Sequence, residues 1–394
     1  MAGNERFRVI FPPKGVIGTG GKTDRLLGRW DLPIPEKKQG PHSAGKEHMT
    51  YKELLESARD KIGPYCKACS VCNGRACSNQ IPGPGAKGSG DVAVRNFDAW
   101  QKIRINMNTI AENKTPDTSF SFFGCQMRYP IFAGPVGAVN LHYGDQLNDI
   151  SYNDILVSAA KEAGICAFTG DGTNAEVMKA ATRAIEANDG VGVPTVKPWD
   201  AGTIREKFAL VRASRSIAVA MDVDAAGLPF LQGLTPPAGS KTVLELRDIV
   251  QMAGKPFIVK GVMTVQGALD AKQAGASAIV VSNHGGRVLD GTPSTAEVLE
   301  DIAAAVKGDM MILVDGGIRT GLDVFRALAL GADAVLIARP YVTAVYGGGK
   351  EGVALYTEKI GRELADTMKM CGVSSLKGIT KSCLFQPTSK IVSF

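Results

Sequence analysis

Residues 311–340, MILVDGGIRTGLDVFRALALGADAVLIARP, contain a structural unit that recurs along the chain. A short apolar run at 311–317 ends in two glycines and is followed by a helical pattern. Gly331 closes that pattern, as glycine often does after the last turn of a helix, and a second apolar run follows at 333–339. A strand, a crossover helix and another strand in this order predict two parallel strands of one sheet.

The same alternation of apolar runs and helical patterns is present from residue 130 onward. Eight strand–helix units are the number that closes a (β/α)8 barrel, so the sequence predicts an α/β fold of the TIM-barrel type. An open, doubly wound sheet is the alternative, but no G-x-G-x-x-G turn follows the first run. The eight runs are 130–134, 165–169, 191–195, 217–223, 256–261, 277–283, 311–317 and 333–339.

Composition limits the classes of function. Of the 394 residues, 44% are hydrophobic and 21% are charged, and the net charge is +6. The basic residues are dispersed, which argues against a nucleic-acid partner and is compatible with an anionic cofactor or substrate. Because no apolar run reaches membrane-spanning length and no signal peptide is recognisable, we expect a cytoplasmic protein without a membrane span.

Three segments are expected. Residues 1–48 are rich in Gly, Pro and basic residues, and we expect a flexible extension or, if Met49 is the true start, a non-native one. Residues 49–125 are expected to form an N-terminal helix, capped by Thr50 and Glu53, and a cysteine-rich segment. The barrel is expected to occupy 126–394.

Polar residues follow several predicted strands at the ends where barrels of this type place their active sites. His284 is flanked by glycines after the sixth strand and is a candidate general base, because imidazole titrates near neutral pH; a solvated loop histidine is the alternative. Arg287 is suited to bind a carboxylate with two hydrogen bonds. Lys260, at the end of the fifth strand, supplies a fixed positive charge or a salt bridge in the barrel mouth.

A phosphate site is predicted after the last two strands. Gly316 and Gly317 permit close approach of the backbone, Arg319 adds charge, and the helix that opens near Thr320 is expected to offer free N–H groups. Arg339 ends the eighth strand, and barrels commonly bind phosphate in these two loops. The alternative is that the glycines serve only tight turns.

These motifs together resemble one enzyme family. VKGV (259–262), VSNHGGRVLDGTPSTAEVL (281–299), the run from 314 to 340 and MKMCGVSSLKGI (368–379) are similar to the FMN-dependent α-hydroxy acid oxidases and dehydrogenases. The resemblance extends in order over roughly residues 50–385. It implies an FMN-binding barrel enzyme that oxidises a small 2-hydroxy acid, and, by analogy with the family, a homo-oligomer.

The resemblance assigns roles to individual residues. His284 matches the catalytic base, Lys260 the lysine beside the flavin, and Arg287 the arginine that holds the substrate carboxylate. Tyr51 aligns with an N-terminal active-site tyrosine. The positions that match FMN contacts are Ala133, Gly134, Pro135, Lys260, Ser282, Asp315, Gly316, Gly317, Arg319, Ala338 and Arg339.

The chain also departs from the family pattern. Thr195 and Lys197 stand where the family has a glutamine and a tyrosine after the third strand. After the fourth strand, MDVDAAG carries Asp222 in place of a threonine, no second substrate arginine occurs before Arg247, and the short segment that follows cuts down the usual lid. Lys197 can replace part of the lost positive charge as a point donor.

Four of the eight cysteines, Cys66, Cys69, Cys72 and Cys77, form a C-x2-C-x2-C-x4-C stretch that the family usually lacks. The compact spacing favours a [4Fe–4S] cluster; zinc is the second alternative and free redox thiols are the third. A cluster would pass electrons from reduced FMN to a ferredoxin-like protein acceptor, and so indicates a dehydrogenase. The other cysteines are expected to be small buried apolar residues.

The leading hypothesis is therefore an FMN-dependent 2-hydroxy acid dehydrogenase coupled through iron–sulfur. An FMN-dependent isomerase, of the type 2 isopentenyl diphosphate isomerase kind, is one alternative. A flavin and iron–sulfur redox protein without a dedicated substrate is another. The pair His284 and Arg287 argues against both alternatives.

Overall fold

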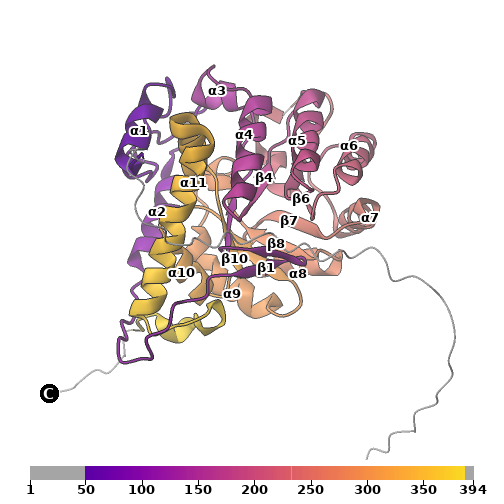
Figure 1. Cartoon of the computed structure of the whole chain (residues 1–394). Coiled ribbons are helices and arrows are strands. Elements are labelled where there is room, and N and C mark those ends of the chain that lie inside the picture. Colours follow the sequence, from indigo (N-terminus) through magenta and orange to yellow (C-terminus); the bar gives the residue numbers. More distant parts are fainter. Residues whose placement is uncertain (1–48, 232, 387–394) are drawn as a thin grey trace, which may run out of the picture.

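The computed structural model describes residues 49–231 and 233–386, so the extension expected at 1–48 lies outside the described residues. Eight parallel strands close into a barrel (Figure 1) in the order β10-β3-β4-β5-β6-β7-β8-β9. They are β3 (Ile131–Ala133), β4 (Cys166–Thr169), β5 (Val193–Val196), β6 (Val219–Asp222), β7 (Phe257–Val262), β8 (Ala278–Val281), β9 (Met311–Val314) and β10 (Ala334–Ile337).

The predicted TIM barrel is confirmed, because every strand lies within one of the eight apolar runs or extends beyond it by one residue. The strands are buried on both faces along nearly their whole length, as parallel strands covered by helices are. The closed order excludes the doubly wound alternative.

Helices surround the barrel on its outside (Figure 1). Several begin with a capping box in which a side chain and the third residue of the helix satisfy each other's backbone N–H groups, as at Thr242 and Ser294. The helices that follow strands are α3 (Val139–Tyr143), α4 (Asp149–Glu162), α5 (Ala175–Ala187), α6 (Ala201–Ala213), α7 (Val243–Ala253), α8 (Val265–Gln273), α9 (Thr295–Val306), α10 (Gly321–Ala329) and α11 (Arg339–Met370).

Two helices precede the barrel. The helix α1 (Tyr51–Arg59) begins at the predicted cap formed by Thr50 and Glu53, and it lies beside α11 (Figure 1). The helix α2 (Asp91–Lys102) contacts the carboxyl ends of β8 and β9, where Trp100 Nε1 donates to the carbonyl of Gly316 over 2.7 Å. No helix in the described part of the chain is both long and apolar enough to cross a membrane.

Just before the barrel, β1 (Phe120–Phe122) and β2 (Cys125–Met127) pair antiparallel and form a hairpin that the sequence motifs did not predict. The hairpin spans the boundary that was expected between the N-terminal segment (49–125) and the barrel (126–394). Phe122, Cys125 and Met127 are buried in one cluster with the inward side chains of the strands, including Phe132 and Phe168. Because β3 follows directly, the hairpin covers the amino-terminal end of the barrel core.

Short 3-10 turns complete the chain. Those that form the site are η1 (Val223–Gly227) and η2 (Pro229–Leu231) after β6, and η3 (His284–Gly286) after β8; η4 (Leu376–Gly378) and η5 (Lys381–Cys383) lie near the C-terminus. The cysteine-rich segment, residues 63–90, contains turns but no helix or strand.

We predict that Phe122→Ala lowers the free energy of unfolding by about 3–5 kcal/mol, because it leaves a cavity beside a ring whose centroid is 4.5 Å away, that of Phe132. Urea unfolding followed by circular dichroism measures the change. The matched control is Ile110→Ala, a side chain 97% exposed, for which we expect a change within about 0.5 kcal/mol. Equal effects of the two variants would show that the hairpin does not contribute to the barrel core.

Candidate active site

The carboxyl ends of the strands surround a cavity of about 310 Å³, within the size range of small-molecule sites. Most of the predicted site residues line it, although they come from five different strand ends. These are Pro135, Lys260, His284, Arg287, Asp315, Gly316, Gly317, Arg319, Ala338 and Arg339. Ala133, Gly134 and Ser282 belong to the same strand ends but are not among the lining residues.

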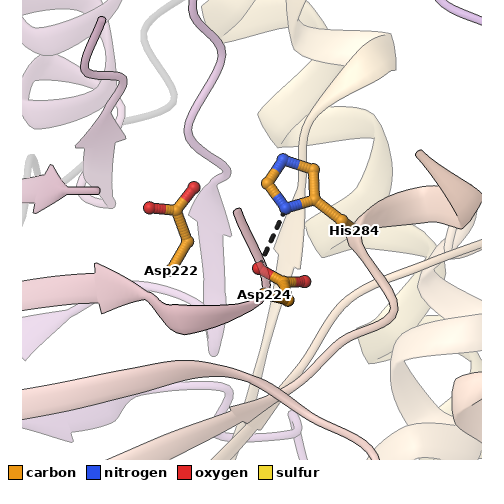
Figure 2. Close-up of side chains that lie close together, drawn as sticks. All are labelled: Asp222, Asp224 and His284. Carbon is orange, nitrogen blue, oxygen red and sulfur yellow. Dashed lines mark hydrogen bonds and ion pairs between the residues drawn. The ribbon is translucent and has the colours of Figure 1, made fainter. Parts of the chain in front are cut away.

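The candidate base is held by a carboxylate. The Nδ1 atom of His284 lies 3.0 Å from Oδ1 of Asp224 (Figure 2), which belongs to η1 after β6. His284 has a left-handed φ of 54°, and Ser282 Oγ accepts its backbone N–H, which fixes the turn. With Nδ1–H donated to Asp224, the Nε2 atom is left as the proton acceptor.

Asp224 was not identified from the sequence. The stretch MDVDAAG contains two acids, and only the first, Asp222, ends the strand. An acid two residues beyond a barrel strand still lies at the same mouth, so the pattern Asp-x-Asp after the fourth apolar run was the signal that could have located it.

Burial and a neighbouring cation set the ionisation of this pair. Burial and the Lys260 ammonium lower the pKa of His284, and Asp224 opposes them in part. Burial disfavours the Asp224 carboxylate, but Lys260 and His284 hold its pKa below the usual range. At neutral pH the pair is therefore a neutral imidazole and a carboxylate, the state that a general base requires.

Lys260 remains positively charged inside the barrel. Burial alone would lower the pKa of Lys260, but Asp224, Asp315 and Asp222 together raise it above its ordinary value. The nearest carboxylate contact is Asp315 Oδ2 at 3.8 Å, and the other oxygen of Asp315 is buried without a hydrogen-bond partner. The Lys260 ammonium can therefore still donate a hydrogen bond to a ligand, and the Asp315 carboxylate can still accept one.

Three half-buried arginines form the cationic side of the cavity, and each donates to backbone carbonyls of the cysteine-rich segment. Arg287 Nη1 donates to Gly83 O and Gly85 O over 2.7 and 2.9 Å. Arg319 Nε donates to Cys72 O over 2.7 Å, and Arg339 Nε donates to Pro84 O over 2.8 Å. Within 49–231 and 233–386, none of the three forms a salt bridge with a carboxylate.

Cations withdrawn from water are normally paired, so these arginines indicate that the site binds anions. Burial and the nearby Arg339 lower the pKa of Arg287 to about 10, which leaves it charged at neutral pH but in a site that favours a negative ligand. A phosphate beside Arg319 and Arg339, and a carboxylate beside Arg287, would supply the missing counter-charges.

The expectation of free N–H groups at the start of α10 is wrong. The backbone N–H groups of Arg319 and Thr320 donate to Asp323 Oδ2, and that of Gly321 donates to Glu363 Oε2. The capping side chain takes the place that a phosphate would need. Positive charge for a phosphate therefore comes from the arginine side chains.

Gly317 has a packing role that is independent of any ligand. Its φ is +81°, and a Cβ atom there would lie 2.2 Å from the carbonyl oxygen of Asn96 in α2. Gly317 therefore serves a turn, as the alternative prediction proposed, and the close approach of α2 explains why a glycine is needed there.

The cavity fits FMN by criteria independent of the family resemblance. Asp315, which lines the cavity, has one carboxylate oxygen buried without a hydrogen-bond partner. An unpaired buried acceptor is costly, and the ring N–H of a flavin is a donor that would suit it. Arg319 and Arg339 suit its phosphate, and Lys260 suits the negative charge of a reduced ring.

The departures from the family pattern also meet at the cavity. Lys197, which follows β5, lines it, and its Nζ atom lies 3.3 Å from Asp222 Oδ2. Single oxygen or nitrogen atoms of Asp222, Asp224 and His284 lie within 4.8 Å of one another (Figure 2), close enough for a metal ion. The ammonium groups of Lys197 and Lys260 already face these acids, so the cluster is better described as an acid–base network.

Tyr51, predicted to belong to the active site, lines a different cavity from His284, and its role stays a prediction. Its ring stacks on Tyr356 with centroids 5.9 Å apart and borders a second, smaller cavity. Burial, followed by the neighbouring Cys72, raises the pKa of Tyr51 to about 12. The helix that carries it packs on α11, where Ser57 Oγ donates to the carbonyl of Gly347.

The second cavity, of about 40 Å³, brings the four clustered cysteines together, and Arg339 lines both cavities. Burial, with smaller effects of the neighbouring cysteines, raises the pKa of Cys66 to about 11. In the described chain, no three cysteine sulfurs lie within 4.8 Å of one another.

Outside that segment, Cys125 and Cys166 are buried, as expected for small apolar residues. Cys371 and Cys383 are only half-buried, which differs from the prediction. The reason is their position, since Cys371 follows the C-terminal end of α11 and Cys383 ends η5 at the surface.

Fold and cavity together define a TIM-barrel enzyme with a site for a phosphate-bearing ligand. The family model for FMN-dependent dehydrogenase matches residues 84–230 and 230–386, and the chain belongs to that family.

Curated relatives match only part of the chain. L-lactate dehydrogenase of Acinetobacter baumannii is 49% identical over 131 residues, which is 33% of this chain and 34% of the relative. The enzyme of the same name from Acinetobacter baylyi is 45% identical over 138 residues, or 35% and 36% of the two chains. The matched region thus spans about a third of these relatives.

Solved structures match over most of the chain. A mandelate oxidase variant with 2-hydroxy-phenylacetamide has a TM-score of 0.69 and 25% identity, covering 86% of this chain and 98% of that one. A second mandelate oxidase variant, with the C4a-OH-FMN adduct, has a TM-score of 0.66 and 26% identity, covering 84% and 98%. A lactate oxidase of Pediococcus acidilactici, at 24% identity and a TM-score of 0.70, shares the fold and covers 86% and 96%.

We predict that kcat/KM falls as the pH drops through a pKa below about 6.5, because burial and Lys260 disfavour the protonated form of His284. Asp224→Asn removes a negative charge that raises this pKa, so its acid limb should move to lower pH while its maximal rate falls. Profiles of kcat/KM against pH for both proteins test this. A limb that moves upward in the variant would contradict the arrangement.

Proposed function

We propose that this protein is an FMN-dependent dehydrogenase that oxidises a 2-hydroxy acid to the 2-oxo acid. The observation that carries the proposal is the cavity that joins the His284–Asp224 pair to three arginines without carboxylate partners in the described chain. The family membership and the likeness to mandelate oxidase structures support the same reaction class.

The residues of the chain divide the work of the reaction. Arg319 and Arg339 hold the phosphate of the cofactor, and Arg287 binds the substrate carboxylate. His284 Nε2 takes the hydroxyl proton, and Asp224 keeps the ring oriented and stabilises the imidazolium that forms. Lys260 places a fixed positive charge where negative charge develops on the cofactor. Bound FMN supplies the chemistry of accepting the two electrons and the hydrogen released from the carbinol carbon.

For the electron outlet, we propose that Cys66, Cys69, Cys72 and Cys77 hold a [4Fe–4S] cluster. The cavity that the four cysteines line together, their compact C-x2-C-x2-C-x4-C spacing and the position of Arg339 at both cavities support it. The two electrons of each turnover would leave one at a time to a ferredoxin-like protein, and the two protons would leave to solvent. Zinc in the same cavity is the competing alternative, and it could not carry electrons.

The reaction class is tested by mixing the anaerobic flavoprotein with glycolate, L-lactate or L-mandelate and following the flavin absorbance. At least one acid should bleach the flavin of the wild-type protein. His284→Ala should slow the bleaching by about 10²–10⁴-fold, with FMN content unchanged. Wild-type flavin that none of the acids reduces would refute the proposed reaction, and the surface variant Ile110→Ala should behave as wild type.

The cysteine site is tested by iron, sulfide and zinc analysis of protein purified without oxygen. We expect about four irons per chain, and none in Cys72→Ser. The matched control is Cys383→Ser, a half-buried cysteine outside the cluster cavity, which should keep its iron. One zinc and no iron per chain would refute the proposed transfer of electrons through a [4Fe–4S] cluster but would leave the proposed oxidation of the hydroxy acid intact.

A further inference from the structure

Two charged side chains at the ends of adjacent strands have no role in the mechanism above. Lys197 follows β5, and Asp222 is the last residue of β6. Their side chains are 12% and 6% exposed, with Nζ of Lys197 3.3 Å from Oδ2 of Asp222. Lys197 lines the same cavity as His284, and Asp222 lies beside the His284–Asp224 pair (Figure 2).

The Lys197 ammonium is not required to neutralise Asp171, because Asp171 already has another cation as its partner. Asp171 receives Lys207 Nζ and Trp199 Nε1, both at 2.7 Å, so its charge is compensated without the Lys197 side chain. Asp222 is the carboxylate partner of Lys197, through one oxygen only, and its other oxygen is buried without a partner. An ammonium has three donors, so donors remain for a ligand in the cavity.

Arg287 has only part of its guanidinium group available for a substrate carboxylate. Both hydrogens of its Nη1 atom are used by the carbonyls of Gly83 and Gly85. Its Nη2 atom lies 3.1 Å from Nε2 of His142. The fork between the two terminal nitrogens is therefore unavailable, and Nε with one Nη2 hydrogen is what remains for a carboxylate. A second cation on the substrate side would strengthen this one-sided contact.

We infer that Lys197, oriented by Asp222, binds the substrate carboxylate together with Arg287, and that the substrate is a 2-hydroxy monocarboxylate with an apolar side chain. This inference rests on the proposed function. Asp222 draws the ammonium to one position, which replaces the geometric precision that a second arginine would supply.

The apolar character of the substrate side chain follows from the part of the cavity wall that carries no charged residue. Leu228 and Leu231, from the short segment after β6, line the cavity together with Leu141 and Val136. A second carboxylate on the substrate would meet this wall or the unpartnered oxygen of Asp222, and both are unfavourable for an anion. Apolar surface of the substrate would instead be removed from water there.

The carboxylate contact is tested with pyruvate, a 2-oxo monocarboxylate, whose binding is followed through the flavin spectrum of the oxidised holoenzyme. Lys197→Met should weaken pyruvate binding and raise KM by tenfold or more with a smaller change in kcat, whereas Lys197→Arg should stay within about threefold of wild type. Asp222→Asn should fall between them. Unchanged pyruvate binding in Lys197→Met would overturn the inference.

Two further outcomes separate this inference from the proposed function. If no hydroxy acid reduces the wild-type flavin but Lys197→Met still weakens pyruvate binding, the inferred carboxylate site is supported and the proposed oxidation is refuted. If Lys197→Met does not retain FMN, the comparison of Lys197→Gln with Lys197→Arg decides in the same assay, and equal affinities would overturn the inference.

The side-chain class is tested by comparing L-lactate, 2-hydroxybutyrate and L-malate as substrates. We expect kcat/KM to rise from lactate to 2-hydroxybutyrate and to fall at least tenfold for malate. Leu228→Asp should reduce the preference for 2-hydroxybutyrate over lactate without removing FMN. A wild-type preference for malate would refute the apolar wall as the determinant.

Discussion

The hydrogen bonds from three arginines to the carbonyls of residues 72–85 are the interaction on which the site depends. The barrel supplies the guanidinium groups from three successive strands, and the cysteine-rich segment supplies the acceptors. A carbonyl orients an arginine but leaves its charge uncompensated. The cavity therefore holds positive charge that an anionic ligand would compensate, and this charge comes from side chains and not from the N–H groups at the start of α10.

The acid–base network on the opposite side of the cavity balances this charge. Asp222, Asp224 and Asp315 face Lys197 and Lys260, so each acid has a cation near it, yet each keeps one oxygen buried without a partner. This arrangement keeps Lys260 charged and His284 neutral at the same pH. Burial lowers the pKa of both groups, so it favours the neutral imidazole by itself, whereas Lys260 keeps its charge only because the three acids oppose burial.

The sequence predicted the barrel well because its evidence is local and repeated. Buried parallel strands appear as short apolar runs, and each residue near a strand end must lie at the same mouth, so His284, Arg287 and Arg339 could be assigned together. Asp224 escaped because it lies in a turn beyond its strand. The stacking of Tyr51 on Tyr356 was not predicted, because it joins residues about 300 apart in the chain, which no local pattern encodes.

The positions of the cysteines were visible in the sequence, but their neighbours were not. A spacing of C-x2-C-x2-C-x4-C shows that four sulfurs can converge, whereas the contact of Cys72 with Arg319 joins two loops that are 247 residues apart. The blocked helix start at Thr320 is similar, because the capping role of Asp323 competes with a phosphate only once the turn has formed.

The shared arginines make the two cavities thermodynamically dependent on each other. A ligand that fixes the cysteine-rich segment also fixes Arg319 and Arg339, and linkage requires that an anion bound to those arginines stabilises the segment to the same extent. If the proposed cluster occupies the cysteine cavity, its loss would also weaken the binding of an anion at Arg339, although the two sites are separate cavities.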